Sequence, residues 1–408
     1  MQDETAGVST PDKQAQLWRY AWICVVTCTL IYLFREVGAW RGWWKGENLS
    51  LWITWGLDPM NASGFLSIFV AFQLASSFDV RTRGLWVLAG LLVEFFVFLN
   101  RPFTWDFQSR LAAVGLGFGV TGVIGLGWQA HAFPRVRTYR FLLLIATFLF
   151  LYPRDVDLCH SLLANWTPQV FDPTGIVIDR LWGREPVVDL TNWLQTTGGL
   201  FPLRLIYVEL PLCLCLAIYW NYTAAERSSF NFLKAFLLST GLGFLCYAIL
   251  PMVGPLVFYS HIPWRESWNE CSTNLSLPLS RGCMPSLHAT WGWLIFRAFA
   301  DLGPRGWKLG GLFCLFTSVS IFPVGGHYLI DIVPALPLAT LVWALSSWHP
   351  RWKLAAGALA ALFGWVLAFR LCPLWLCQQA HLTRGLQIAT LLVFGWILAR
   401  PQVQREVD

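Results

Sequence analysis

Two short stretches of the chain contain residues whose types and spacing suit phosphate chemistry. In "CMPSLHATWG", residues 283–292, His288 follows Pro285 and Ser286 at the start of an apolar segment. Proline is typical of a helix start, where unpaired backbone N–H groups and the positive end of the helix dipole can hold an anion such as phosphate. In "VGGHYLIDIV", His327 and Asp331 are four residues apart and are therefore expected on one face of a helix.

A carboxylate one helical turn from an imidazole can accept its N–H, fix the tautomer and stabilise the imidazolium. The other ring nitrogen is then free to attack or to transfer a proton. Two apolar segments, 286–300 and 306–326, separate the two stretches and are expected to bring His288 and His327/Asp331 to the same membrane face. Each residue alone has a plainer explanation, because interfacial histidines and buried ion pairs often only support packing. Their joint occurrence beside Pro-Ser and Gly-Gly favours a catalytic set.

The composition indicates a multi-pass membrane protein. Hydrophobic residues make up 56% of the 408 residues and charged residues only 13%, and a spanning helix needs about 17–25 mainly apolar residues. We predict an all-α, polytopic membrane helix bundle of about twelve transmembrane helices. These are expected near residues 17–36, 60–78, 84–100, 111–130, 139–153, 201–221, 232–254, 286–300, 306–326, 328–346, 354–371 and 384–400.

The positive charges predict which side of the membrane the site faces. With a cytosolic N-terminus, most arginines and lysines fall in short cytosolic connections, as the positive-inside rule requires. The active site is then on the extracytoplasmic (periplasmic or lumenal) face. The net charge of +6 is spread over many loops, which excludes nucleic acid as an expected partner and favours the membrane bilayer with its anionic headgroups.

The predicted orientation also places cysteines in an oxidising compartment, which permits disulfides. Cys271 and Cys283 share one extracytoplasmic loop, and we predict a bridge between them. Cys372 and Cys377 share another loop. The remaining cysteines fall mostly within spans and are expected to be small apolar fillers.

The polar stretch 154–193 divides the chain, because it is too charged to span a membrane and too apolar for a flexible linker. We predict an N-terminal transmembrane extension of unknown role (1–153), a catalytic domain (154–346) that includes an interfacial segment (154–200), and a C-terminal transmembrane pair (347–408). Within the N-terminal extension, Glu94 is the exceptional intramembrane carboxylate, which is either functional or bonded to a neighbouring helix.

The stretches "PSLH" and "SIFPVGGHYLID" resemble the second and third motifs of the type 2 phosphatidic acid phosphatase superfamily, usually Pro-Ser-Gly-His and Ser-Arg-x5-His-x3-Asp. The wording "CMPSLHATW … GGHYLID" is most similar to the inositol phosphorylceramide synthase-like (inositolphosphotransferase) branch. The resemblance covers about residues 170–346 and implies a six-helix phosphatidic acid phosphatase-like core preceded by extra N-terminal spans.

The resemblance implies roles for the candidate residues. His327 would be the nucleophile that takes the phosphoryl group, Asp331 would orient it, and His288 would protonate the leaving alcohol. Ser286 would help to bind the phosphate, as a phosphoryl-transfer site requires.

Three phosphate-binding cations of the family pattern are missing. Ile321 follows Ser320 where the third motif has arginine, and Ala248 and Gly254 occupy the lysine and arginine positions of the first motif, Lys-x6-Arg-Pro. Arg281 and Arg265 are the nearest candidate replacements, with Arg180 and Arg204 more distant. The synthase-like branch also lacks parts of these motifs, so the departures favour that branch.

The sequence therefore predicts an integral membrane lipid phosphotransferase. It would move a phosphate-containing, phosphoinositol-like headgroup from a phospholipid donor to a lipid or alcohol acceptor through a phosphohistidine intermediate. A lipid phosphate phosphatase acting on a phosphomonoester or pyrophosphate lipid is the first alternative, since only the acceptor differs. A non-catalytic transporter or scaffold is the second, with Glu94 as its test residue.

A zinc site built from His288, His327 and Asp331 is a further alternative. The catalytic arrangement already explains the spacing of these residues, and no further ligand is evident in the sequence. We therefore expect no cofactor and no metal.

Overall fold

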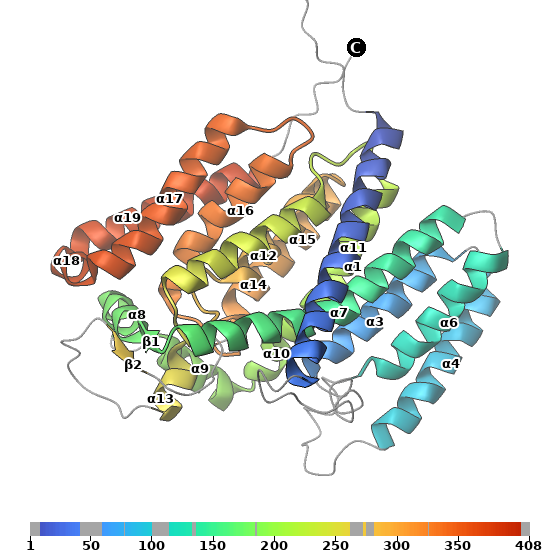
Figure 1. Cartoon of the computed structure of the whole chain (residues 1–408), viewed down its shortest axis with the longest axis horizontal. Coiled ribbons are helices and arrows are strands. Elements are labelled where there is room, and N and C mark those ends of the chain that lie inside the picture. The colour runs from blue at the N-terminus through green and yellow to red at the C-terminus, as the bar shows by residue number, and fades with distance from the viewer. Residues whose placement is uncertain are drawn as a thin grey trace, which may run out of the picture. The chain divides into compact units, whose positions relative to one another are not determined.

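The computed structural model describes residues 9–40, 59–76, 78–99, 114–132, 136–183, 186–261, 272–274, 281–324 and 326–400. Over these residues the chain is mostly helical, as predicted (Figure 1). It forms two compact units, which are described separately. Unit 1 comprises Met1–Leu158 and Val208–Glu226, and unit 2 comprises Cys159–Tyr207 and Arg227–Asp408.

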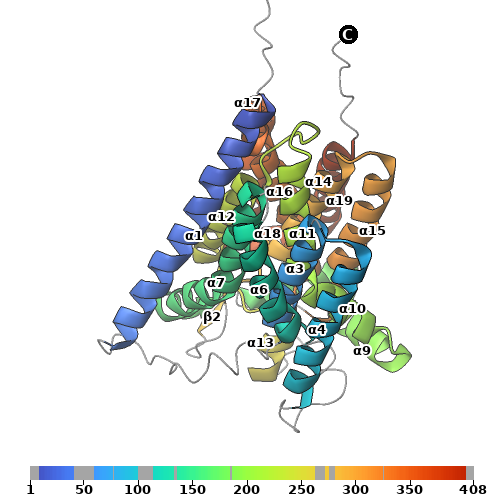
Figure 2. The same ribbon diagram turned by 90° about the vertical axis from the view of Figure 1, so that its right-hand side faces the viewer.

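Unit 1 is a bundle of long apolar helices. Its helices are α1 (Thr10–Trp40), α3 (Pro59–Ala75), α4 (Val80–Leu99), α6 (Leu116–Ala132), α11 (Leu210–Thr223) and most of α7 (Val136–Trp166). Figure 2 shows α3, α4 and α6 side by side, and α6 packs against both of the others. Aromatic rings join α1, α7 and α11: Phe141 lies 5.7 Å from Trp18 and stacks on Tyr222 at 4.1 Å, measured between ring centroids.

Glu94 has a structural partner in unit 1. Its side chain on α4 is buried, and Oε2 accepts hydrogen bonds from the backbone N–H groups of Gly115 (3.0 Å) and Gly117 (2.8 Å) at the start of α6. The first N–H groups of a helix have no partner within the helix, and a carboxylate there satisfies them and is stabilised by the helix dipole. Glu94, the intramembrane carboxylate that the sequence analysis singled out, therefore caps the N-terminus of α6.

Unit 2 combines long apolar helices with a group of short ones. The long helices are α12 (Phe232–Ile249), α14 (Leu287–Ala300), α15 (Pro304–Ser320), α16 (Ile332–Ser346), α17 (Trp352–Leu371) and α19 (Ala380–Ala399). The short elements are α8 (Asp172–Asp179), η1 (Arg180–Trp182), α9 (Pro186–Thr197), α10 (Leu200–Val208), α13 (Pro255–His261), η2 (Leu329–Asp331) and α18 (Pro373–Gln378). Two-residue strands β1 (Gln169–Val170) and β2 (Thr273–Asn274) pair antiparallel.

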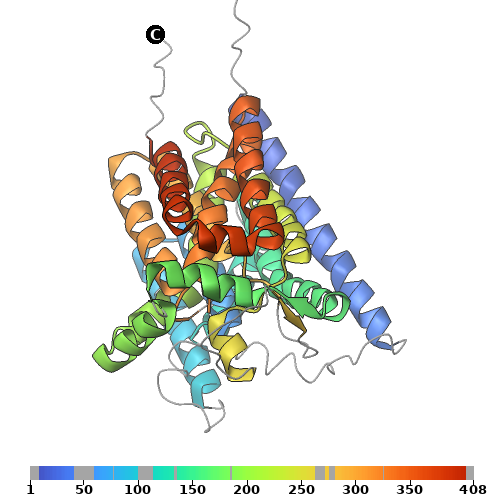
Figure 3. The ribbon, with the colours of Figure 1, turned by 90° about the vertical axis from the view of Figure 1, so that its left-hand side faces the viewer.

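Helix α16 is the centre of unit 2. It is apolar on all sides and packs against α12, α14, α17 and α19, which are seen together in Figure 3. A helix that is hydrophobic all round is stable only when it is surrounded. Since η2 leads directly into α16, this buried helix fixes the position of Asp331.

The predicted count of twelve spans is not confirmed. Among the described residues, six helices are long and apolar enough to cross a membrane: Thr10–Phe34, Val80–Leu99, Phe232–Ile249, Leu329–Ser346, Trp352–Leu371 and Ala380–Ala399. The segment predicted at 201–221 is broken into α10 and α11, which meet at a bend of 42° and would add a seventh span if they cross together. Helices α3, α6, α14 and α15 have only 17, 17, 14 and 17 residues.

The polar stretch after the first five apolar segments does form short helices, but it starts later than the sequence suggested. Helix α7 continues to Trp166, and α8, η1 and α9 follow it. The domain boundaries predicted from the sequence, 1–153, 154–346 and 347–408, stay a prediction.

Candidate active site

The start of α14 carries the first motif-like stretch. Ser286 is the N-cap residue, and its hydroxyl accepts a hydrogen bond from the backbone N–H of Ala289 at 3.3 Å. Its own backbone N–H donates to the backbone oxygen of Asp331 at 3.1 Å. The helix start is thereby tied to the segment that carries the second histidine and the aspartate, and its remaining N–H groups form a site suited to an anion.

His327 and Asp331 are in contact, although not through the helical turn that the sequence predicted. His327 Nδ1 lies 3.0 Å from Asp331 Oδ2. His327 sits in a loop after Gly326, which has a φ of +65°, and the helical geometry begins only with the 3₁₀ turn η2. The Asp331 carboxylate accepts the backbone N–H of Tyr328 at 2.9 Å and so caps that turn, which is why the helix does not extend back to His327.

One carboxylate oxygen orients the His327 ring. Asp331 Oδ2 accepts from Tyr328 N–H and from the thiol of Cys283 at 2.7 Å, in addition to its contact with Nδ1. With Nδ1 held in this way, Nε2 is directed toward the Ser286 hydroxyl, 3.4 Å away. The ring nitrogen available for attack is therefore Nε2, and it lies at the N-terminus of α14.

Cys283 is a free, buried thiol, and Cys271, its predicted disulfide partner, lies outside the described residues. The Cys283 sulfur points to Asp331 and lies 3.6 Å from His327 Nδ1. Burial, together with the Asp331 carboxylate, raises the pKa of the thiol well above its ordinary value. The predicted phosphate-binding residue Arg265 also lies outside the described residues.

His288 is the second residue of α14, and its ring lies near that of His327. Its ring centroid is 6.4 Å from that of His327, with the two planes at 64°. Tyr207 of α10 stacks on His288 at 4.3 Å, and its hydroxyl is 3.4 Å from His288 Nδ1. No motif in the sequence singles out Tyr207. Its ring and hydroxyl hold the His288 ring so that Nε2 remains for a substrate oxygen.

Of Arg281 and Arg265, the two nearest candidates for phosphate binding, Arg281 is the one within the described residues, and it is fully buried. Its Nε donates to the backbone oxygen of Thr167 at 3.5 Å. Burial lowers the pKa of the guanidinium, and the Asp172 carboxylate partly offsets this effect. These contacts place Arg281 beside Thr167 and within the electrostatic influence of Asp172.

The structure shows why two of the positions where the resembled family has cations hold uncharged residues here. Ile321 is fully buried in an apolar cluster with Val187, Tyr207 and Ala289, where a charge would be costly. Gly254 has a φ of +92°, and a Cβ added to it would overlap the backbone oxygen of Gly326. The segment before α13 therefore packs directly on the His327 loop, and it leaves no room for a side chain at the position where the family has arginine.

Two carboxylates of α8 hold the loops of the site, and the sequence analysis gave them no role. Asp172 accepts backbone N–H groups from Val253 (3.0 Å) and Gly254 (2.8 Å), and the hydroxyl of Tyr328 at 2.9 Å. Asp179 accepts N–H groups from Leu329 (2.8 Å) and Ile330 (3.1 Å). Asp172 and Asp179 are seven positions apart in "DPTGIVID", or about two helical turns, and this spacing was the signal in the sequence that could have identified them.

These two carboxylates are themselves buried. Burial raises the pKa of Asp172 to about 6 and raises the pKa of Asp179 well above its ordinary value. The hydrogen bonds that they accept lower both pKa values and only partly offset the effect of burial.

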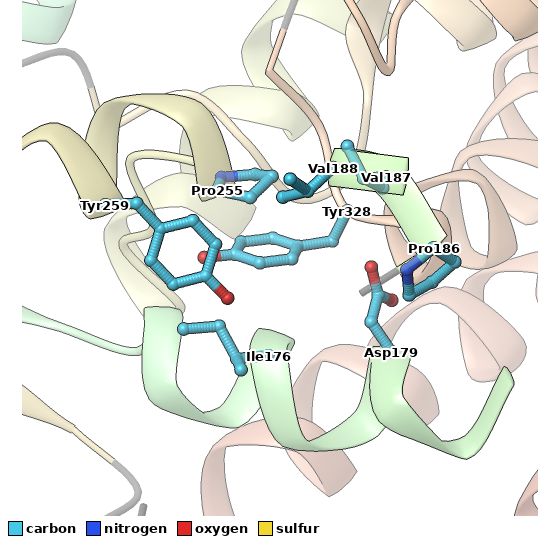
Figure 4. A pocket seen from close by; sticks show the side chains of 8 residues that line it. All are labelled: Ile176, Asp179, Pro186, Val187, Val188, Pro255, Tyr259 and Tyr328. Atoms are coloured by element: carbon cyan, nitrogen blue, oxygen red, sulfur yellow. The ribbon is translucent and has the colours of Figure 1, made fainter. Parts of the chain in front are cut away.

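A small pocket opens beside the His327 loop. It has a volume of about 250 Å³ including its open mouth, and it is lined by Ile176, Asp179, Pro186, Val187, Val188, Pro255, Tyr259 and Tyr328. Figure 4 shows apolar side chains gathered around the Tyr328 ring, with the Asp179 carboxylate beside Pro186. Tyr328 follows the nucleophile candidate directly, so the pocket could receive an apolar part of a substrate that reacts at His327.

Comparison with known protein families gives one match. Residues 176–345 match the family model of the PAP2 superfamily, whose members are generally phosphatases that act on lipid phosphates. This range begins in α8 and ends in α16, and it contains His288, His327 and Asp331. No curated protein and no solved structure matches the chain. The match agrees with the resemblance at the superfamily level, while the synthase-like branch is not confirmed.

Proposed function

We propose that this protein is an integral membrane phosphotransferase that moves a phosphate-containing headgroup from a phospholipid to a lipid or alcohol acceptor. One observation carries the proposal: His327 Nδ1 is held by Asp331, while Nε2 is directed toward Ser286 at the N-terminus of α14. That arrangement supplies a nucleophile with a fixed tautomer and an anion site around the phosphorus.

In the first step, His327 Nε2 attacks the phosphorus of the donor. The bond between phosphorus and the diacylglycerol oxygen breaks as the N–P bond forms, and His288 donates a proton to the leaving oxygen. Burial disfavours a charged His288 ring, and the negative phosphate of the donor offsets this effect. Asp331 stabilises the positive charge that His327 gains.

In the second step, the hydroxyl of the acceptor attacks the same phosphorus. His288, now neutral, takes the hydroxyl proton, and the N–P bond breaks to give the new phosphodiester and free His327. If the donor is instead a lipid phosphomonoester and water replaces the acceptor, the same residues release inorganic phosphate from the intermediate, and the protein is a lipid phosphatase.

The charge of the site favours a phosphodiester donor over a phosphomonoester. A phosphomonoester carries up to two negative charges near neutral pH, whereas a phosphodiester carries one. The three positions where the family has cations hold Ala248, Gly254 and Ile321, so fewer positive groups are available to balance a dianion. A phosphoinositol-like headgroup joined to diacylglycerol is a phosphodiester with one negative charge, so it needs fewer positive groups in the site. We assign phosphate binding to Ser286, the N–H groups of α14, Arg281 and Arg265.

The membrane placement is part of the proposal. The distribution of positive charge supports a cytosolic N-terminus and an active site on the extracytoplasmic face, and the twelve apolar segments of the sequence support more spans than the six long helices alone. The lipid substrates would enter from the bilayer.

A transporter or scaffold is less well supported. Its test residue, Glu94, is engaged in capping α6. We therefore expect Glu94→Gln to leave headgroup transfer intact.

The test is a transfer assay in liposomes with headgroup-labelled phospholipids, with and without ceramide or diacylglycerol. We expect a new labelled lipid that requires both substrates and is lost in His327→Ala. Free inorganic phosphate released from a lipid phosphomonoester without any acceptor would establish the phosphatase instead. Turnover that persists in His327→Ala would refute the assigned chemistry.

A further inference from the structure

The side chains of Cys283, His327 and Asp331 lie close together, and one of them, His327, is the proposed nucleophile. Cys283 Sγ, His327 Nδ1 and Asp331 Oδ2 form a triangle with sides of 2.7 Å (Sγ to Oδ2), 3.0 Å (Nδ1 to Oδ2) and 3.6 Å (Sγ to Nδ1). All three residues are buried. Cys283 was not among the metal ligands considered from the sequence, and His288 does not take part in this triangle.

The three donor atoms form a ligand set that zinc and cadmium prefer. Tetrahedral zinc sites use thiolate, imidazole and carboxylate at ~2.0–2.3 Å, which places neighbouring ligand atoms ~3.3–3.7 Å apart. The distance from Sγ to Nδ1 already falls in this range, and only the carboxylate oxygen must move outward. Asp331 Oδ1 is buried and has no hydrogen-bond partner among the described residues, so the carboxylate has a second oxygen that can take over a bond if Oδ2 shifts toward a metal.

The charges around the triangle also favour a cation. Asp172, Asp179 and Asp331 are buried carboxylates within the same set of loops, and buried charges are usually paired or bound to metal. Ala248, Gly254 and Ile321, at the positions where the family that the chain resembles has cations, add no positive charge. A divalent ion bound by one thiolate and one carboxylate forms a neutral group, which suits a buried site.

We propose that Cys283, His327 and Asp331 form a binding site for a soft divalent metal ion, of the zinc and cadmium class, and that this ion inhibits the enzyme. Binding releases the thiol proton to solvent, since a coordinated thiol is deprotonated. The metal takes the lone pair of His327 Nδ1, so the ring proton moves from Nδ1 to Nε2. Nε2 then has no lone pair with which to attack phosphorus.

The metal site and its inhibitory effect depend on different evidence. Metal binding follows from the geometry alone, whereas inhibition also rests on the proposed function of His327. The test therefore needs a direct measure of binding as well as an activity assay.

The experiment titrates purified, metal-free protein in detergent with Cd²⁺ and follows the ultraviolet charge-transfer absorption of the cadmium–thiolate bond. The variant is Cys283→Ser, and the matched control is Cys314→Ser, since Cys314 is also buried but lies on α15. We expect wild type and Cys314→Ser to give equal absorption, and Cys283→Ser to lose the contribution of one thiolate. His327→Ala should weaken cadmium binding at least tenfold.

Headgroup transfer is measured in the same samples, with Zn²⁺ and then with a chelator. We expect zinc to abolish transfer by wild type and Cys314→Ser, the chelator to restore it, and Cys283→Ser to resist at least tenfold more zinc. Equal cadmium absorption in Cys283→Ser and Cys314→Ser would overturn the metal site. If the cadmium signal depends on Cys283 but metal-free protein transfers no headgroup, the metal site stands and the proposed function fails.

Discussion

Restoring the missing arginine at position 254 should inactivate the protein. In the family pattern an arginine stands here and binds phosphate, so Gly254→Arg would be expected to improve catalysis if the loss were only a loss of charge. The structure predicts the opposite result. Gly254 has a φ of +92°, a Cβ there would overlap the backbone oxygen of Gly326, and it would lie 3.1 Å from the carbonyl carbon.

The size of the effect follows from two costs. An L-residue in the left-handed region costs ~1–2 kcal/mol, and forcing atoms into a closely packed site costs a further ~1–3 kcal/mol. Gly254→Ala already carries both, so it should destabilise unit 2 by ~2–5 kcal/mol and displace Gly326, the neighbour of His327. Gly254→Arg should be at least as severe.

The assay compares apparent melting temperature and headgroup transfer for Gly254→Ala, Gly254→Arg and two controls. Gly241→Ala is the matched glycine control, because no atom lies within 4 Å of its added Cβ. Ala248→Lys restores the other first-motif cation at an exposed position of α12, and it should preserve stability. A Gly254→Arg protein that melts like wild type and transfers headgroups at least as fast would refute the reasoning.

Three further predictions concern the residues that hold the two histidines and their loops. Asp331→Asn removes a charge-assisted hydrogen bond to His327, worth ~1.5–3 kcal/mol, so kcat should fall ~10–150-fold; unchanged kcat would contradict the role of Asp331. Burial raises the pKa of Asp172 to about 6 from 3.8, so the folded protein retains a proton that the unfolded chain loses between pH ~4 and ~6. The apparent melting temperature of wild type should therefore fall as pH rises through this window, and that of Asp172→Asn should fall less. Parallel plots of melting temperature against pH for the two proteins would show that Asp172 does not cause the loss of stability. Tyr207→Phe keeps the stacking on His288 and should lower kcat ~2–10-fold, whereas Tyr207→Leu should lower it further with little change in KM; equal activity of the two variants would show that stacking does not position His288.

The sequence was sufficient to predict that the two histidines and Asp331 lie near one another, because two apolar segments return the chain to the same end and the four-residue spacing of His327 and Asp331 is local. The Pro285-Ser286 helix start and the contact between His327 and Asp331 are both features of local chain geometry. The exact path was not predictable: Asp331 caps a 3₁₀ turn through Tyr328 N–H instead of continuing a helix back to His327.

Other features of the site depend on contacts between distant parts of the chain. Asp172 and Asp179 accept hydrogen bonds from backbone N–H groups 81 to 151 positions away, and their spacing was only a weak signal of a shared helix face. Cys283 was predicted in a disulfide because its loop was expected to be extracytoplasmic, whereas its thiol is turned inward to Asp331. A residue's orientation within a loop is set by tertiary packing, which hydrophobicity and spacing do not specify.

The count of membrane spans shows a second limit of the sequence. Hydropathy located the apolar segments, but it could not show where helices end or bend. The segment 201–221 reads as continuous, yet the helix breaks beside Glu209, between α10 and α11. Helix α14 has 14 residues and is largely buried by its neighbours. A hydropathy window cannot distinguish such a buried helix from a transmembrane helix that faces lipid, because both are apolar.

The most direct test of the central claim is to trap the covalent intermediate on His327. Wild type and His327→Ala would be mixed with a phospholipid labelled at its headgroup phosphorus, quenched within a turnover, and digested under alkaline conditions in which phosphohistidine persists. The phosphohistidine mechanism predicts label on the peptide that contains His327. This label should be lost when acceptor is added before the quench, and it should be absent from His327→Ala. Headgroup transfer by wild type with no label on that peptide at any quench time would contradict this mechanism.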